Sequence, residues 1–208
     1  MQERPAPRLI MLDFDGVVVD SLDAWSEATV AGLAAHGFDH LARPEWVLEM
    51  LEDNWFDGLV RAGVPADVIH EIDERFAALM KTADIPAYPG MADVVGRLGE
   101  LHRVVLITSN RTDLVEELLS RHHIDGVSEV LGGDKEPSKV VKIGSAVAES
   151  GTSDAWFVGD TTGDIVEGRQ AGVRTVATTW GWHSEAQLVK AGPDHVVRSA
   201  LELLRLLS

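Results

Sequence analysis

The sequence has no cysteine among its 208 residues. It therefore has no disulfide, no thiol nucleophile and no thiolate ligand for a metal ion. A metal site in this chain has to use oxygen or imidazole ligands, which favours a hard ion such as Mg2+.

Positive charge is also scarce. The chain carries 18 lysines and arginines against 34 aspartates and glutamates, which gives a formal net charge of -16. A field of this sign repels nucleic-acid phosphates and anionic membrane surfaces, so neither is expected as a partner. A small anionic substrate is still compatible with it, provided that a bound cation and one or two cationic side chains reverse the field inside the site.

Long hydrophobic runs are missing as well. In the N-terminal stretch MQERPAPRLIML the apolar segment is too short for a signal peptide or a membrane span, and acidic residues follow it at once. We therefore expect a cytoplasmic protein. A chain of this length can bury one substantial core and has room for one domain with a modest insertion.

Short apolar segments that end in polar turns recur along the chain. Each is typical of a buried parallel strand that brings polar residues to its carboxyl end. We predict strands at residues 9–13, 104–108, 155–158 and 174–178, with helices between them at 113–121, 139–150 and 164–171. This alternation predicts an α/β fold with a Rossmann-like, doubly wound parallel sheet, in which ligands bind beyond the carboxyl ends of the strands.

The stretch between the first two predicted strands contains only helical patterns, at residues 22–36, 44–61 and 65–81. We predict that residues 21–85 form a small inserted helical cap domain over the carboxyl edge of the sheet. Residues 1–20 and 86–208 are then the α/β core domain. Four aromatic residues gather in the cap segment, where packing inside a helical bundle is the favoured role and contact with substrate is the alternative: Trp25, Trp46, Trp55 and Phe56.

Two carboxylates, Asp13 and Asp15, follow the first predicted strand before the chain turns at Gly16. Covalent phosphoryl transfer needs an oxygen nucleophile and a second group that protonates the leaving alkoxide and then deprotonates water. Asp13 fits the first role and Asp15 the second. Because Asp-x-Asp-Gly turns are also common in loops and calcium sites, this assignment depends on further residues.

A second acidic pair, Asp160 and Asp164, lies at the end of the third predicted strand, where a helix begins. Several carboxylates in one crevice raise one another's pKa values unless a cation lies among them. A magnesium ion with oxygen ligands keeps them ionised and screens the charge of a phosphate from the nucleophile. Asp160 is the better-placed ligand, while Asp164 is either a ligand or the N-cap of the helix.

The second predicted strand ends in hydrogen-bond donors. The Thr108 hydroxyl and the backbone amides of Ser109 and Asn110 are candidates to hold the nonbridging oxygens of a phosphate. Thr112 fits a helix cap instead, and Arg111 is a candidate for one further anion contact.

Phosphoryl transfer also requires a cationic side chain that neutralises the transferred group and keeps Asp13 ionised. Lys135, Lys139 and Lys142 lie in the segment GGDKEPSKVVKI. Lys139 is favoured because it begins the helix that leads to the Asp160 strand, and Lys135 is the alternative. We expect Lys135 in a loop and Lys142 on a helix flank, where lysines are usually solvated.

With these four segments in order, the chain resembles the haloacid dehalogenase superfamily over nearly its whole length, and most closely its members similar to phosphoglycolate phosphatase. The resemblance is carried by DFDGVVVDS from Asp13, LITSN from Leu106, the Lys139 segment and VGDTTGD from Val158. The lysine motif of the family often continues with proline, whereas Val140 follows Lys139 here.

The resemblance implies Mg2+-dependent hydrolysis of a small phosphate monoester, similar to phosphoglycolate, through a phospho-aspartyl intermediate. It implies that Asp13 is the nucleophile and Asp15 the general acid and base, and that Thr108 and Lys139 hold the phosphate. It places Mg2+ at Asp13, at the backbone carbonyl of Asp15 and at Asp160. In the dehalogenases themselves the residue that matches Asp15 is not acidic, so Asp15 favours phosphate chemistry.

Two other functions stay open from the sequence. A sugar phosphomutase would have the same core, and a binding module would have kept the fold without the activity. A monomer and a homodimer are both compatible with the sequence.

Overall fold

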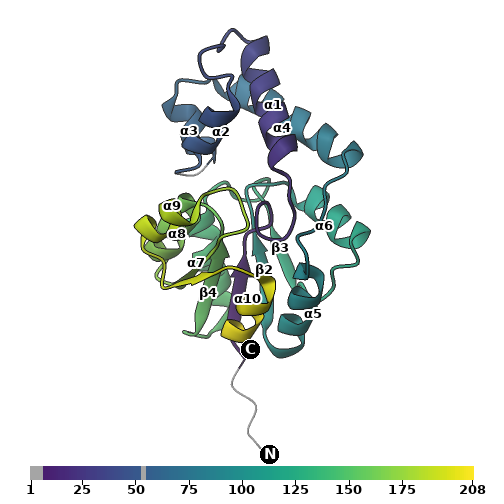
Figure 1. Ribbon diagram of the computed structural model, residues 1–208, viewed down its shortest axis with the longest axis vertical. Coiled ribbons are helices and arrows are strands. Elements are labelled where there is room, and N and C mark those ends of the chain that lie inside the picture. The colour runs from purple at the N-terminus through teal and green to yellow at the C-terminus, as the bar shows by residue number, and fades with distance from the viewer. Residues whose placement is uncertain (1–6, 53–54) are drawn as a thin grey trace, which may run out of the picture.

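The computed structural model describes residues 7–52 and 55–208, and this part of the chain is built around one six-stranded sheet (Figure 1). The strands are β1 (Leu9–Leu12), β2 (Arg103–Ile107), β3 (Glu129–Leu131), β4 (Ala155–Gly159), β5 (Arg174–Thr178) and β6 (His195–Val197). All pairs are parallel, in the order β3-β2-β1-β4-β5-β6. This confirms the doubly wound α/β fold, whose ligand crevice lies where the strand order reverses, at β1 and β4.

Helices cover both faces of the sheet because successive strand residues point to opposite faces. Ile10 and Leu12 of β1 belong to a core with α5 (Met91–Leu101), α6 (Thr112–Arg121) and α10 (Ala200–Leu207). Leu9 and Met11 pack on the other side with α7 (Lys139–Ser150). That side is completed by α8 (Thr162–Gln170) and α9 (Glu185–Ala191).

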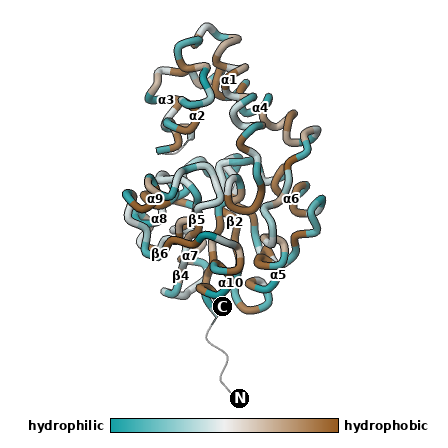
Figure 2. The backbone as a smooth tube through the Cα atoms, in the orientation of Figure 1, coloured by the Kyte–Doolittle hydropathy of each residue, from teal (hydrophilic) through white to brown (hydrophobic). Residues whose placement is uncertain are grey.

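The outer helices owe their place to amphipathic sequences. In α5 and α6 hydrophobic and hydrophilic stretches alternate along the tube (Figure 2). The buried residues of α5 recur three and four positions apart, which puts them on one face of the helix: Met91, Val94, Val95 and Leu98.

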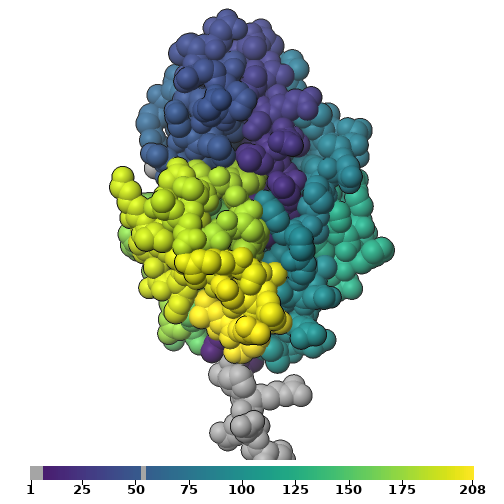
Figure 3. All heavy atoms as spheres, viewed as in Figure 1, coloured from purple at the N-terminus to yellow at the C-terminus, as the bar shows by residue number. Residues whose placement is uncertain are grey.

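Four helices lie together beyond the carboxyl edge of the sheet (Figure 1). They are α1 (Leu22–Ala35), α2 (Pro44–Met50), α3 (Trp55–Arg61) and α4 (Ala66–Thr82). α1 packs along α4, and Figure 3 shows the group resting on the segment that follows β5. None of the helices described here combines the length and hydrophobicity that crossing a lipid bilayer requires.

The ends of the four predicted strands lie within one residue of the observed ends. The ends of the predicted helices lie within two residues of the observed ends, except for one helix. The single helix predicted at residues 44–61 is wrong, because α2 ends at Met50 and α3 begins at Trp55. Asp53 and Asn54, which that prediction included, lie outside the described residues. The edge strands β3 and β6 were not predicted, since each has only three residues and shows no extended apolar pattern.

Candidate active site

The carboxyl ends of β1, β2 and β4 meet in one buried crevice. Asp13 and Asp15 follow β1, Thr108 follows β2 and Asp160 follows β4, and all four side chains are buried. The chain turns sharply after Asp15 at Gly16, whose φ is 82°. A Cβ at Gly16 would lie 2.1 Å from Asp160 Oδ2, so glycine lets the β1 turn approach the end of β4.

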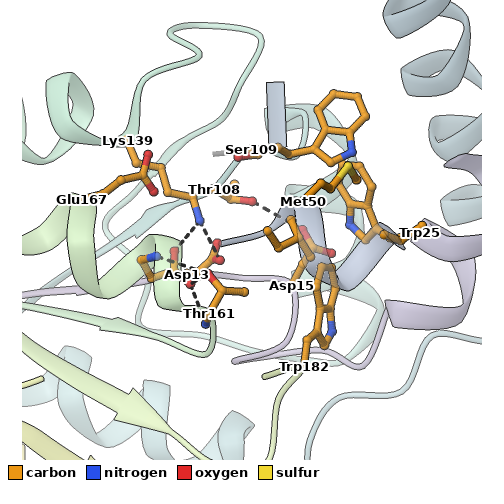
Figure 4. A pocket seen from close by; sticks show the side chains of 14 residues that line it. Asp13, Asp15, Trp25, Met50, Thr108, Ser109, Lys139, Thr161, Glu167 and Trp182 are labelled. Carbon is orange, nitrogen blue, oxygen red and sulfur yellow. Dashed lines mark hydrogen bonds and ion pairs between the residues drawn. The ribbon is translucent and has the colours of Figure 1, made fainter. Parts of the chain in front are cut away.

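Lys139 joins two of the carboxylates in this crevice. Its Nζ lies 2.8 Å from Asp13 Oδ2 and 2.6 Å from Asp164 Oδ1 (Figure 4). Burial lowers the pKa of Lys139, but Asp13 and Asp164 outweigh it and hold the pKa well above its ordinary value. The structure thus brings Lys139 to the site, whereas Lys135 donates to the backbone oxygen of Val130 at 2.8 Å.

Lys142 is not a solvated lysine, so that prediction was wrong. Only 3% of the residue is exposed, and its Nζ donates to the backbone oxygen of Thr108 at 2.6 Å. The helix pattern could have revealed this, because the buried positions of α7 follow the spacing of one helix face: Lys139, Lys142, Ile143 and Ala146.

Asp15 is held by hydrogen bonds from three directions. Its carboxylate accepts from Ser21 Oγ at 2.5 Å, from Asn110 Nδ2 at 3.1 Å and from Thr108 Oγ1 at 3.4 Å. Burial raises the pKa of Asp15, although the bonds from Ser21 and Asn110 act against that rise. The sequence pattern pointed only to the backbone amide of Asn110, so the role of its side chain was not predicted.

Three carboxylates form a group that fits a divalent cation. Asp13, Asp160 and Asp164 each offer an oxygen, and these oxygens all lie within 4.8 Å of one another. Asp160 Oδ1 is buried and has no hydrogen-bond partner in the described structure, while its Oδ2 accepts from the Trp182 amide at 2.7 Å. Burial and the charges of Asp164 and Asp13 raise the pKa of Asp160 well above its ordinary value. An oxygen without a partner among like charges is the environment that a hard cation stabilises.

Asp164 is not the N-cap of the helix, which was one of the two roles predicted for it. Thr161 is the N-cap of α8, and Asp164 completes a capping box from the third helical position. Its Oδ2 accepts from the Thr161 hydroxyl at 2.7 Å and its Oδ1 from Lys139. Asp164 therefore fixes the lysine, and it also belongs to the acidic group with Asp13 and Asp160.

The predicted phosphate donors lie beside this group. Thr108 and Ser109 line the cavity that contains Asp13 (Figure 4), and Thr108 Oγ1 accepts from the Asn110 amide at 3.0 Å. Thr112 is not the helix cap, since α6 has Arg111 at its N-cap and Thr112 donates to Asp134. Arg111 does not reach the cavity either.

The Arg111 guanidinium instead joins α6 to the helices beyond the sheet edge. It lies 2.8 Å from Glu74 of α4 and 3.2 Å from Asp113. Both partners are exposed carboxylates, so the contact is a surface ion pair between α4 and α6.

Residues 10–178 match the model of one protein family, described as haloacid dehalogenase-like hydrolase. The chain belongs to this family. Among curated relatives of the hydrolase, the phosphoglycolate phosphatase of Synechococcus elongatus is 27% identical over 94% of this chain and 95% of that protein. Phosphoglycolate phosphatase 1 of Pseudomonas aeruginosa is 29% identical over 95% of this chain and 79% of that protein.

Solved structures of haloacid dehalogenase-like hydrolases share the fold. One from Streptococcus pneumoniae has a TM-score of 0.76 at 21% identity, covering 97% of this chain and 99% of that chain. The family, the fold and a phosphatase class of enzyme, all expected from the sequence, are thereby confirmed.

Proposed function

We propose that this phosphatase hydrolyses a small-molecule phosphate monoester through a phospho-aspartyl intermediate on Asp13, with Mg2+ as its cofactor. One observation carries the proposal: Asp13 Oδ2 lies 2.8 Å from Nζ of the buried Lys139, and Asp13 shares an acidic group with an Asp160 oxygen that has no hydrogen-bond partner among the described residues. A nucleophile, a cation for the transferred group and a place for a metal ion thus occupy one crevice.

Asp13 supplies the oxygen that attacks phosphorus. The pKa of Asp13 is raised to about 7, mainly by burial and further by the charge of Asp164, although Lys139 acts against the rise. Lys139 therefore favours the ionised, nucleophilic form of Asp13. Mg2+ bound by Asp13, Asp160 and the Asp15 backbone carbonyl would neutralise charge on the phosphate and lower the pKa of the carboxylates further.

Asp15 transfers the protons in both half-reactions. It protonates the ester oxygen as the bond from phosphorus to that oxygen breaks, and it later takes a proton from the water that attacks phospho-Asp13. Its raised pKa suits a carboxyl group that has to be protonated in the first step. Thr108 and Ser109, which line the same cavity, hold the nonbridging phosphate oxygens with Lys139.

Residues 21–85 act as a cap domain in this proposal. Residues of α1, α2 and α3 line the cavity above Asp13 from the side opposite the sheet. A cap in this position excludes water from the phospho-enzyme and contacts the alcohol part of the ester.

The test is phosphate release from a panel of small esters, in Mg2+ and in EDTA. Phosphoglycolate is one of the first esters to include, because two relatives of the chain are named phosphoglycolate phosphatases. Wild type should be active only with Mg2+, Asp13→Asn should be inactive, and the control Asp67→Asn, on the exposed face of α4, should match wild type. Turnover by Asp13→Asn would refute the mechanism, and activation by a sugar 1,6-bisphosphate would support a phosphomutase instead.

A further inference from the structure

We propose that the alcohol released from the ester is small, uncharged and largely apolar. This inference rests on the proposed function and adds the substrate class. The wall of the cavity beyond Asp13 and Asp15 is formed by apolar and indole side chains of the cap helices and of the segment after β5: Trp25, Val47, Met50, Leu51, Trp55 and Trp182.

Among the described residues, this wall offers no cation to pair with a second anionic group. Among the described residues that line the cavity, Lys139 is the only cation, and Asp13 and Asp164 already hold it. Asp13, Asp15, Asp164 and Glu167 give the same lining four carboxylates. Burying a further carboxylate without a cation is strongly unfavourable, so the leaving group of a good substrate carries no negative charge.

The indoles of the wall hold one another in place. Trp25 stacks on Phe76 with ring centroids 3.9 Å apart, and it meets Trp55 and Trp182 edge-on at 5.0 and 6.4 Å. In Figure 4 the Trp25 and Trp182 rings flank the Asp15 carboxylate, where the alcohol oxygen of the ester has to lie. The alcohol therefore meets aromatic faces and edges immediately beyond its oxygen.

Two of these indoles also have an unused donor. The N–H groups of Trp55 and Trp182 are buried and make no hydrogen bond within the part of the chain that the structure describes. A neutral acceptor oxygen on the alcohol would be compatible with them. An indole N–H is an uncharged donor, so it does not replace the cation that a buried carboxylate requires.

Size and charge limit the substrate separately. The cavity has a volume of about 40 Å³, which favours an ester with a small alcohol. Phosphoglycolate and a neutral ester whose alcohol has the same number of non-hydrogen atoms need nearly the same space, so size does not separate them. The charge of the phosphoglycolate carboxylate is therefore the property that the wall discriminates against.

The experiment compares three esters whose alcohols have the same number of non-hydrogen atoms: isobutyl phosphate, carbamoylmethyl phosphate and phosphoglycolate. The carbamoyl ester keeps the electron-withdrawing carbonyl of phosphoglycolate and removes its charge. In Mg2+, kcat/KM for the carbamoyl ester should exceed that for phosphoglycolate by about a hundredfold, with isobutyl phosphate also above phosphoglycolate. Equal or faster turnover of phosphoglycolate overturns the inference and leaves the proposed function standing. If none of the three is hydrolysed, both fail.

A charge placed in the wall gives a second measurement. Met50→Arg adds a cation to the cavity lining. The ratio of kcat/KM for phosphoglycolate to kcat/KM for the carbamoyl ester should therefore rise at least about tenfold. Val60→Arg is the matched control, since Val60 lies on α3, is 62% exposed and does not line the cavity. An unchanged ratio in a folded Met50→Arg overturns the inference; should that variant fail to fold, the wild-type ester series decides.

Discussion

Lys142 is a buried lysine whose charge the fold retains at neutral pH at a cost in stability. The side chain is 3% exposed and its Nζ donates to the Thr108 backbone oxygen. Burial lowers the pKa of Lys142 from 10.5 to about 8, with the charge of Lys139 acting in the same direction. The unfolded chain therefore binds a proton at Lys142 more tightly than the folded chain does.

The sign of the pH effect follows from this difference. Below pH 8 both states are protonated and the full penalty applies, and it disappears as the pH rises through the interval from 8 to 10.5. At 1.36 kcal/mol per pKa unit, the penalty is about 3 kcal/mol at pH 7 and about 1 kcal/mol at pH 9.5. Lys142 thus makes the folded protein about 2 kcal/mol more stable at pH 9.5 than at pH 7, relative to a residue that does not titrate.

Lys142→Met removes the titrating group and keeps an unbranched side chain that is one atom shorter. Urea unfolding followed by tryptophan fluorescence gives the free energy of unfolding of wild type and variant at pH 7 and pH 9.5. The free energy of wild type minus that of Lys142→Met should rise by about 2 kcal/mol between the two pH values. Lys190→Met, at an exposed position of α9, is the control and should show no such rise. A constant difference for Lys142→Met, or one that falls with pH, would refute the argument from burial.

Three further substitutions test the catalytic assignments. Lys139→Met should lower kcat about 10²–10³-fold in a phosphate-release assay, because the transferred group and Asp13 lose their buried cation; activity within a factor of ten of wild type would contradict this role. Asp15→Asn should lower kcat about 10²–10⁴-fold for an alkyl ester and much less for 4-nitrophenyl phosphate, whose leaving group needs no proton, and an equal loss on both would exclude Asp15 as the general acid. Asp160→Asn should raise the Tm of the metal-free protein by about 2–4 °C, since it removes a buried acidic group next to Asp13 and Asp164. It should also abolish the rise in Tm that Mg2+ gives wild type, because a ligand is lost. A Mg2+-dependent rise in Tm that persists in the variant would exclude Asp160 from the metal site.

The order of buried segments and polar turns was enough to predict the sheet and the convergence of its strand ends. Asp13, Thr108 and Asp160 could be placed because each directly follows a strand, and parallel strands present their carboxyl ends at one edge. Lys139 could be placed because it begins α7 at that same edge. These predictions need only local patterns and the topology of the sheet.

Apart from the helix predicted at residues 44–61, the main predictions that failed concern contacts between segments far apart in the chain. Lys142 reaches the Thr108 oxygen across 34 positions, and Arg111 reaches Glu74 across 37. Nothing near Arg111 in the sequence shows that α4 brings a carboxylate to it. The sequence also could not separate the two roles considered for the aromatic residues between positions 21 and 85, packing and substrate contact. One residue can serve both, since Trp25 stacks on Phe76 and also lines the cavity.

The segment after β5 connects the acidic group to α2 within two residues. The Trp182 amide donates to Asp160 Oδ2 at 2.7 Å, and the Trp182 ring belongs to the cavity wall. The next residue, His183, accepts from the Thr162 amide at 3.0 Å and donates from Nε2 to the backbone oxygen of Leu48 in α2 at 3.0 Å. A movement of α2 away from the core has to break the bond between His183 and Leu48 or displace His183 together with Trp182. The position of α2 and the orientation of the Asp160 carboxylate therefore depend on two adjacent residues, Trp182 and His183. If the helices beyond the sheet edge are the cap that we propose, its opening has to act on this connection.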